Sequence, residues 1–386
     1  MRNARNYFSW CLVAGVLISA ALCCPGVVAA AAQPKTLEIG AVAPDFSLPG
    51  VDDKTYTLAD FKGANLLVII FTCNHCPTAQ AYEERIKHLA ADYQDKGVAV
   101  VAIQPNDPTA VRLDELAYTD LSDSFEDMKT RAHDHEFNFP YLYDGEMQAT
   151  AKAYGPIATP HVFIFDKDRR LRFCGRIDDH ENPTKTTTHD ARDAIEALLA
   201  DKPVPAAMTK TFGCSIKWAD KKSGAAAAIK KWDGETADLQ TIDADGLREL
   251  VANKGEKLRV INVWATWCGP CVTEFPELIT ILRTYRSRGV ELVTVTADAP
   301  DNHDAALKFL NEQHASGANY IFDKDDPYAL ADAVGVEWQG ALPLTLVVKP
   351  GGEVIYKKMG PVDALELRRA IVDEISPYYF KLEKTQ

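Results

Sequence analysis

Two pairs of cysteines, each pair separated by two residues, are the groups in this sequence best suited to chemistry. The first pair lies in the sequence CNHC at residues 73–76, and the second lies in CGPC at residues 268–271. Two thiols at this spacing can alternate between a dithiol and a disulfide, or they can bind a soft metal ion. Disulfide exchange requires a thiolate, whereas a free cysteine has a pKa of about 8.5. The chain must therefore surround these sulfurs with groups that stabilise an anion.

Each pair follows an apolar run typical of a strand that is buried on both faces, at residues 66–71 and at residues 258–264. A helical pattern follows each pair and ends at Gly97 or at Gly289, and another apolar run comes directly after that glycine. The pattern predicts two β-α-β units. In each unit the cysteines lie at the carboxyl end of a strand and at the start of a helix, where open α/β sheets place their sites.

The start of a helix stabilises an anion, because it carries unpaired N–H groups and the equivalent of about half a positive charge. We therefore expect the first cysteine of each pair, Cys73 or Cys268, to be the attacking thiolate. The second cysteine, Cys76 or Cys271, is then expected to resolve the mixed disulfide that the attack creates.

The residues between the cysteines modulate the reduction potential. Gly269-Pro270 is the dipeptide of reducing centres, with potentials near about −270 mV. His75 places an imidazole next to Cys76, where it can stabilise the attacking thiolate and therefore the reduced form. We expect the first pair to have the higher potential, by more than about 30 mV.

The composition is that of an acidic, globular chain. Its 386 residues include 42 Lys and Arg against 55 Asp and Glu, which gives a net charge of −13, and 47% are hydrophobic. The length predicts two or three domains. The charge argues against binding to nucleic acid or to an anionic membrane surface.

Residues 1–32 have the plan of a secretory signal peptide, with a basic start, an apolar stretch and a run of alanines. An uncleaved anchor is the alternative, and a lipoprotein site at Cys23 or Cys24 fits less well because no small residue precedes it. Export to the periplasm or another extracytoplasmic compartment lets disulfides persist. Removal of this segment leaves six cysteines, Cys73, Cys76, Cys174, Cys214, Cys268 and Cys271.

The two halves of the chain are duplicates in plan. Late in each half a proline, Pro160 or Pro343, precedes a further apolar strand, and a charged strand and a last helix follow. A stretch rich in lysine and alanine separates the halves and is expected to be a linker. The predicted division is a signal peptide at residues 1–32, a first domain at 36–205, a linker at 206–235 and a second domain at 236–386.

The second half contains WATWCGPC at residues 264–271, followed by Glu274 and Pro276 and later by Leu342-Pro343. In these residues it resembles the thioredoxin superfamily, and within it the exported TlpA/ResA-like thiol–disulfide oxidoreductases. The resemblance implies that Glu274 is an active-site carboxylate and that the proline after Leu342 is cis and faces the cysteines. Asn262 stands where thioredoxins have a buried aspartate, so Glu274 is the better candidate for a base.

The first half contains IGAVAPDFSL at residues 39–48, LADFKG at residues 58–63 and Thr159-Pro160. In these residues it resembles the redoxin, or AhpC/TSA-like, branch of the same superfamily. The sequence FGCSIKW at residues 212–218 is similar to a motif that closes exported domains of this kind.

A peroxiredoxin requires the pattern Pro-x-x-x-Thr-x-x-Cys. If the pattern ends on Cys76, Ile69 and Cys73 stand where Pro and Thr belong, and a pattern that ends on Cys73 fits no better. This departure argues against peroxidase activity in the first half.

These resemblances imply an α/β protein with two tandem thioredoxin-like domains, each a central mixed β-sheet flanked by helices. They imply thiol–disulfide exchange on protein substrates, with Thr159, Pro160, Leu342, Pro343 and Trp267 in substrate binding. The implied partners are protein thiols and disulfides and a membrane thiol reductant that donates electrons. We expect no cofactor beyond the redox-active disulfides, no metal, no nucleic acid and no stable membrane insertion after signal cleavage.

Two alternatives stay open for the first half, and in both the second domain would keep the first reduced. In one, Cys73, Cys76 and a histidine such as His161 hold Cu(I), which favours soft thiolates. Copper-delivery proteins of this superfamily usually space their cysteines by three residues, however, and not by two. In the other, the first domain is a thiol peroxidase.

Two further features outside the pairs have no assigned chemistry. Cys174 and Cys214 can form a structural disulfide or stay free thiols, because the sequence does not place their Cα atoms within the required ~4.4–6.8 Å. The acid-rich stretch at residues 114–127 is expected to be a solvated loop and helix.

Overall fold

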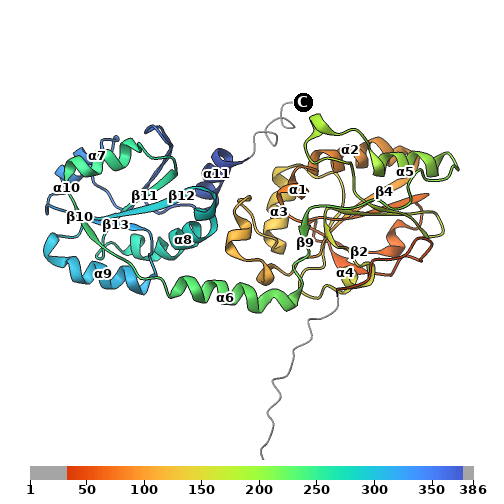
Figure 1. The fold of residues 1–386 in the computed structure, drawn as a ribbon, viewed down its shortest axis with the longest axis horizontal. Helices are drawn as coiled ribbons and strands as arrows, with labels where there is room; N and C mark the ends of the chain where they lie inside the picture. Colours follow the sequence, from red (N-terminus) through yellow and green to blue (C-terminus); the bar gives the residue numbers. More distant parts are fainter. Residues whose placement is uncertain (1–32, 377–386) are drawn as a thin grey trace, which may run out of the picture. The chain divides into compact units, whose positions relative to one another are not determined.

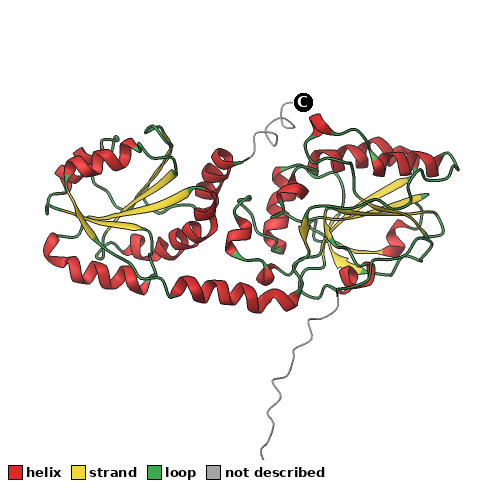
Figure 2. Cartoon of the chain, viewed as in Figure 1, coloured by secondary structure: helices red, strands yellow, loops and turns green. Residues whose placement is uncertain are grey.

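The computed structural model describes residues 33–376 (Figures 1 and 2). The expected signal peptide at residues 1–32 lies outside the described residues. Each half of the described chain forms one mixed β-sheet with helices packed against it, so the predicted α/β class is confirmed. Within residues 33–376, no helix combines the length and the apolar character needed to cross a membrane.

The first-half sheet has the strand order β5-β4-β3-β7-β8, in which β3, β4 and β5 are parallel and β7 and β8 are antiparallel to their neighbours. Its strands are β3 (Leu66–Phe71), β4 (Val98–Gln104), β5 (Tyr141–Tyr143), β7 (His161–Phe165) and β8 (Leu171–Gly175). Its helices are α1 (Pro77–Gln80), α2 (Glu83–Tyr93), α3 (Phe125–Asp134), α4 (Ala149–Tyr154) and α5 (Asp190–Leu199). The first half also contains two separate two-stranded sheets. One pairs β1 (Ser47–Pro49) with β2 (Thr55–Thr57), and the other pairs β6 (Ala158–Thr159) with β9 (Cys214–Ser215).

All six residues of β3 are buried, because both faces of the sheet are covered. Alternate residues from Leu66 to Ile70 pack into a core that includes α2 and α5, and those from Leu67 to Phe71 pack into a second core that includes Tyr154 of α4. The continuous apolar run in the sequence is therefore the consequence of two cores meeting at one strand.

The second-half sheet has the order β10-β13-β12-β11-β14-β15, and only β14 and β15 are antiparallel to their neighbours. Its strands are β10 (Gln240–Ile242), β11 (Leu258–Trp264), β12 (Val290–Thr296), β13 (Ala318–Phe322), β14 (Leu344–Val348) and β15 (Val354–Met359). Its helices are α7 (Ala244–Ala252), α8 (Gly269–Tyr285), α9 (His303–Glu312), α10 (Pro327–Val334) and α11 (Ala364–Ile375).

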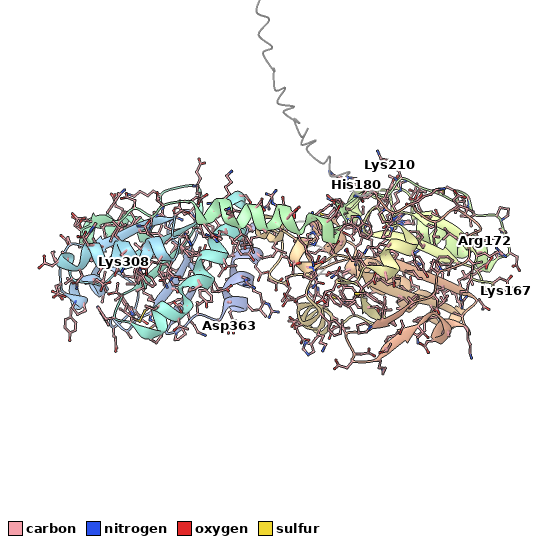
Figure 3. The ribbon with its side chains drawn as sticks, turned by 90° about the horizontal axis from the view of Figure 1, so that it is seen from below. Lys167, Arg172, His180, Lys210, Lys308 and Asp363 are labelled. Atoms are coloured by element: carbon pink, nitrogen blue, oxygen red, sulfur yellow. A yellow bond between two sulfur atoms is a disulfide. The ribbon has the colours of Figure 1, made fainter. Side chains whose placement is uncertain are left out.

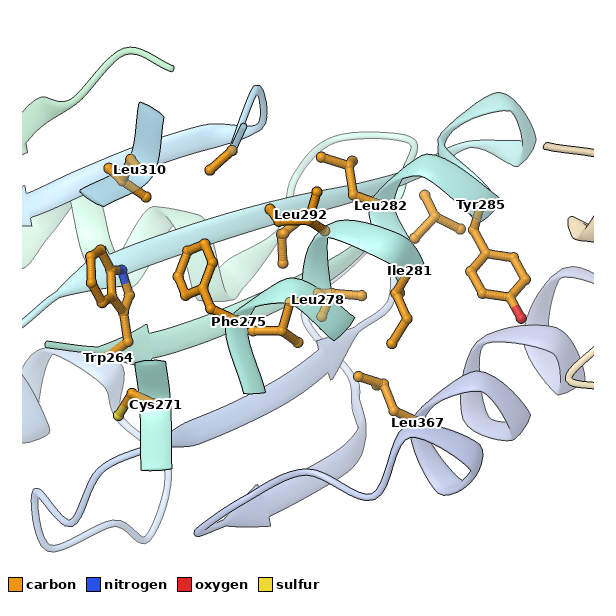
Figure 4. Packing of buried hydrophobic residues seen from close by; sticks show 14 of the residues in the cluster. Trp264, Cys271, Phe275, Leu278, Ile281, Leu282, Tyr285, Leu292, Leu310 and Leu367 are labelled. Atoms are coloured by element: carbon orange, nitrogen blue, oxygen red, sulfur yellow. The ribbon is translucent and has the colours of Figure 1, made fainter. Parts of the chain in front are cut away.

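The longest of these helices, α8, packs its apolar face on the sheet and positions the second cysteine pair (Figure 4). Trp264 at the end of β11 and Phe275 of α8 have ring centroids 4.9 Å apart, and Phe309 of α9 lies 5.1 Å from Phe275. The last helix, α11, begins where Asp363, labelled in Figure 3, accepts the N–H groups of its first turn.

The segment at residues 206–235, expected to be a linker, is structured. β9 pairs with β6, and Ile216 and Trp218 are buried in a core of the first half. Helix α6 (Lys222–Asp233) follows, with Trp232 buried. The Lys and Ala content that suggested a linker is that of a helix, because both residue types have high helix propensity.

Candidate active sites

The second cysteine pair lies at the start of α8 as a disulfide between Cys268 and Cys271, with Cα atoms 5.3 Å apart. Cys268 is the N-cap residue, and its Sγ accepts the backbone N–H of Cys271 at 3.3 Å. Pro270 lies in the first turn, where the missing N–H costs no helical hydrogen bond. Of the two sulfurs, Cys268 belongs to the more accessible residue, since Cys271 is fully buried.

A pocket of about 370 Å³ is lined by Trp267, the residue that directly precedes Cys268. Trp267, Leu342 and Trp338 contribute to its lining, and Trp267 is 68% exposed. The Leu342-Pro343 peptide bond is cis, as expected. The predicted rim residues of the second centre, Trp267 and Leu342, are thus brought to one concave surface.

Glu274 lies one turn further along α8 and is almost completely buried. Its carboxylate accepts the side-chain amide of Asn262 at 3.1 Å and the backbone N–H of Val362 at 2.8 Å. Burial raises the pKa of Glu274, although both hydrogen bonds act in the opposite direction. A carboxyl whose pKa is raised by burial binds a proton more readily than an exposed one, which suits a residue that accepts and returns a proton.

The first cysteine pair is placed differently from the second, and the expectation that Cys73 lies at the helix N-terminus is wrong. The N-cap residue of α1 is Cys76, whose Sγ accepts the N–H of Ala79 at 3.4 Å. Cys76 and Cys268 each come ten residues after the first residue of the strand, so they are equivalent. Helix α1 begins at Pro77, the position that suits a residue without an N–H.

A second contact supports this correspondence. Asp123 accepts the backbone N–H of Asn74 at 2.9 Å, and Asp298 accepts the backbone N–H of Thr266 at the same distance. Asn74 and Thr266 each come eight residues after the start of the strand. The two CxxC sequences are therefore offset by three residues in the fold, and Ala79 takes the position that Cys271 has in the second half.

Asp123 is the residue of the first centre that the sequence analysis missed. It lies in the acidic stretch expected to be solvated, yet it is fully buried. One carboxylate oxygen accepts the backbone N–H groups of Asn74 and His75, and the other lies 2.6 Å from His75 Nδ1 and accepts the Asn106 amide. Nothing in the pattern of that stretch distinguishes this aspartate from its neighbours.

The Asp123–His75 contact determines the charge at the centre. Burial lowers the pKa of His75, but the charge of Asp123 and its hydrogen bond outweigh burial and raise it. Burial raises the pKa of Asp123, and the charge of His75 outweighs that effect and lowers it. The pair therefore favours the protonated form of His75, whose Nδ1 also lies 3.5 Å from Cys73 Sγ.

The same environment shifts the pKa values of the two thiols in opposite directions. Burial raises the pKa of Cys73 well above its ordinary value, and Cys76 and Asp123 raise it further. Burial acts on Cys76 as well, but hydrogen bonds from Cys214 and Cys73 and the charge of His75 hold the pKa of Cys76 well below its ordinary value. Of the two sulfurs, Cys76 is therefore the better candidate for the thiolate of the first centre.

The cis peptide Thr159-Pro160 lies against both sulfurs. Cys73 Sγ lies 3.2 Å from the Thr159 hydroxyl. As a thiol, Cys76 can donate to the Thr159 carbonyl oxygen at 3.2 Å, and as a thiolate it accepts the N–H groups of Ala79 and Cys214. Cys214 packs directly against this cluster, a neighbour that its remote position in the sequence did not reveal.

The histidine considered as a copper ligand is engaged elsewhere. His161 Nε2 lies 3.2 Å from Cys174 Sγ and Nδ1 accepts the N–H of Ile157, so both ring nitrogens are engaged away from the CNHC pair. Burial lowers the pKa of His161 to about 4 and raises that of Cys174 to about 12. Cys174 and Cys214 are both free thiols.

A different set of metal-binding side chains lies in the first centre. The donor atoms of Cys73, His75 and Asp123 are within 4.8 Å of one another. His75 Nδ1 is already hydrogen-bonded to the Asp123 carboxylate at 2.6 Å. An ion at this position would have to replace that bond, so the arrangement fits a charge pair better than a ligand set.

Comparisons with known proteins found several similar chains. Thiol-disulfide oxidoreductase ResA of Bacillus subtilis is 32% identical over 114 residues, which are 29% of this chain and 59% of ResA, so the chain spans less than two thirds of that relative. Thiol:disulfide interchange protein HelX of Rhodobacter capsulatus is 33% identical over 171 residues, 44% of this chain and 73% of HelX. The crystal structure of a hypothetical protein from Sinorhizobium meliloti is 35% identical, covers 48% of this chain and 98% of its own, and has a TM-score of 0.43.

The AhpC/TSA family matches the chain in two segments, residues 39–174 and residues 229–357. Each segment contains one of the two sheets and one of the two CxxC sequences. Together they cover more than half of the chain, and the chain therefore belongs to the AhpC/TSA family.

Proposed function

We propose that this protein is an exported thiol–disulfide oxidoreductase that acts on protein disulfides and thiols through its Cys268–Cys271 centre. One observation carries the proposal: this disulfide lies at a helix N-terminus and directly follows Trp267, which is exposed and lines a pocket together with Leu342. A protein disulfide has to reach the attacking sulfur along such an open apolar surface. The names of ResA and HelX describe the same chemistry in relatives.

In the reducing direction, the Cys268 thiolate attacks one sulfur of the substrate disulfide, and the other substrate sulfur leaves as a thiolate. Cys271 then attacks Cys268, which releases the second substrate thiolate and forms the Cys268–Cys271 disulfide. The helix N-terminus stabilises the Cys268 anion. We assign to Glu274 the proton that Cys271 loses, because its buried carboxyl has a raised pKa.

The remaining expectations belong to the same proposal. Residues 1–32 direct export, the site of action is the periplasm or an equivalent compartment, and a membrane thiol reductant returns electrons to Cys268 and Cys271. The chemistry needs no cofactor beyond the redox-active cysteines. We also propose that the first centre has the higher potential, because a stabilised Cys76 thiolate favours the reduced form.

A second candidate activity for the first half is reduction of a small hydroperoxide. Its support is that the stabilised thiolate, Cys76, is fully buried beneath β9, where a small oxidant fits better than a protein chain. The thiolate would attack one peroxide oxygen to give a sulfenic acid and release an alcohol or water. A second thiol would then expel water and form a disulfide.

The test is turnover of insulin disulfides by the full chain with dithiothreitol as the electron source. We expect the double variant Cys268→Ser/Cys271→Ser to lose nearly all catalysis, and Cys73→Ser/Cys76→Ser to retain most of it. Cys174→Ser is the matched control, because this buried thiol belongs to neither centre. Full turnover without Cys268 and Cys271 would refute the proposal. Consumption of cumene hydroperoxide that is lost with Cys76→Ser would establish the second activity.

A further inference from the structure

The strand β9 occupies the edge of the first centre that a substrate chain would use. It pairs antiparallel with β6, with Cys214 opposite Thr159 and Ser215 opposite Ala158. Thr159 is the residue before the cis-proline, whose backbone we expect an extended substrate to pair with. In the second half, Leu342 holds the same place in the sequence but lines an open pocket. The chain thus presents its own strand to the first centre, with a cysteine in the paired position.

The contacts around β9 hold it firmly in that position. Gly213 has φ +132°, and a Cβ at this residue would lie 2.0 Å from the Thr159 carbonyl oxygen, so only glycine fits. The Thr211 hydroxyl donates to the Pro160 carbonyl at 3.0 Å. On the other side, the Lys217 backbone N–H donates to Asn106 at 2.8 Å, and its ammonium is paired with Glu115.

This placement brings a third sulfur to the pair. The backbone N–H of Cys214 donates to Cys76 Sγ at 3.4 Å, and its side chain packs against Cys73, Cys76 and Ala79. The Cys76 side chain is the largest cause of the raised pKa of Cys214, ahead of burial. Cys73 and Cys76 are buried, whereas Cys214 is partly exposed.

The helix supplies no partner for Cys76. In the second half, Cys271 lies three residues after the capping Cys268 and closes the disulfide, but the equivalent residue of α1 is Ala79. A thiolate in this fold therefore needs a partner from outside the helix. Cys73 is one neighbour, but it is held by the Thr159 hydroxyl in the buried interior. Cys214 is the neighbour that solvent also reaches.

We propose that Cys214 is the disulfide partner of Cys76, so that the first redox centre is formed by Cys76 and Cys214. This inference rests on the proposed redox function of the first half. It assigns to β9 the place of a substrate strand that is permanently attached to the site.

Disulfide exchange at Cys76 and Cys214 conserves both protons and electrons. Cys214 sulfur attacks one sulfur of an external disulfide while its proton passes to Cys76, and one external thiolate leaves. That thiolate takes the proton from Cys76, which is again a thiolate. Cys76 then attacks Cys214, and the second external thiolate leaves as the Cys76–Cys214 disulfide forms. Two electrons pass from the two cysteines to the external disulfide.

The experiment maps disulfides in the full chain as it is oxidised. The reduced protein is equilibrated with glutathione buffers of rising disulfide content, quenched, alkylated, digested and analysed by mass spectrometry. We expect a Cys76–Cys214 cross-link in the wild type and in Cys73→Ser. In Cys214→Ser, we expect the oxidation of Cys76 to need a glutathione disulfide ratio higher by about tenfold or more.

A second variant tests the strand without removing a sulfur. Gly213→Ala should displace β9 and raise the glutathione disulfide ratio needed to oxidise Cys76, as Cys214→Ser does. The control Cys174→Ser should leave the Cys76–Cys214 cross-link unchanged. Chemical denaturation of each reduced variant reports whether the fold is intact. A Cys73–Cys76 disulfide in place of Cys76–Cys214 overturns this inference but leaves the redox function of the first half standing. The absence of any first-half disulfide at all ratios overturns that function itself.

Discussion

Replacement of Asp123 by asparagine should remove the charge that raises the pKa of His75 and so favour the neutral imidazole. The asparagine oxygen can still accept the N–H groups of Asn74 and His75, but its NH2 group then faces His75 Nδ1 and Asn106 Nδ2. His75 can adapt by giving up its Nδ1 proton and accepting a hydrogen bond. Asn106 cannot adapt, because its oxygen accepts the N–H of Lys217.

The magnitude follows from the contacts that are lost. A charge-assisted hydrogen bond contributes about 1.5–3 kcal/mol, and one pKa unit corresponds to about 1.36 kcal/mol. The pKa of His75 should therefore fall by about 1–2 units in Asp123→Asn. The buried Asn106 N–H left without a partner costs a further ~1–3 kcal/mol of unfolding free energy. Loss of the imidazolium also raises the pKa of Cys76, since the charge of His75 lowers it.

Asp123 and His75 contribute to the stability of the fold over opposite sides of the pH range. The pKa of Asp123 is lowered in the folded state, so its contribution is present above about pH 4 and is lost as the pH falls through the folded pKa. The pKa of His75 is raised, so its contribution is complete below about pH 6.5 and is lost as the pH rises through the folded pKa. Wild type and Asp123→Asn should differ most in stability between these limits.

The assay is an NMR titration of His75 combined with thiolate absorbance and chemical denaturation. Asp298→Asn is the matched control. Its oxygen can keep the Thr266 N–H and the Thr296 hydroxyl, and its NH2 can donate to the Thr266 hydroxyl oxygen, so every contact survives. We expect that variant to lose no more than about 1 kcal/mol and to leave His75 unchanged. An unchanged or raised His75 pKa in Asp123→Asn would refute the reasoning.

Three further predictions concern single side chains. In a chain that lacks the second pair, Cys76→Ser should abolish the thiolate absorbance seen well below pH 9, and Cys73→Ser should retain it; the reverse pattern would show that Cys73 is the anion. Glu274→Gln should flatten the pH profile of insulin reduction above pH 4.5, and an unchanged profile would remove Glu274 from proton transfer. Trp267→Ala should raise KM without lowering kcat and alter the unfolding free energy by less than about 0.5 kcal/mol, because Trp267 is 68% exposed; an unchanged KM would exclude it from substrate binding.

The sheets and their central strands could be predicted from the sequence because burial on both faces leaves a continuous apolar run, as in β3 and β11. The cis bonds before Pro160 and Pro343 were also predictable, since they follow from the resemblance to thioredoxins. A short stretch of sequence was sufficient for both predictions: an apolar run for the strands, and a family motif for the cis bonds. The helix start at Cys76 was missed because the CxxC spacing is the same whichever cysteine caps the helix.

The rest of the first centre could not be predicted, because it is assembled by contacts between distant parts of the chain. Asp123 reaches the site from a loop whose acidic composition resembles any solvated surface. Cys214 arrives through the pairing of β9 with β6, which places residue 214 beside residue 76. Neither contact leaves a periodic signal, and a two-residue strand is too short to show alternation.

The pairing of β9 with β6 has a kinetic consequence. A strand in the same chain has an effective concentration at its site in the millimolar range or above. A separate protein chain present at micromolar concentration therefore competes poorly for the edge next to Thr159. Within residues 33–376, no strand pairs with Leu342. We therefore expect the second centre to act on dilute protein substrates, and the first to act on small molecules that need no backbone pairing.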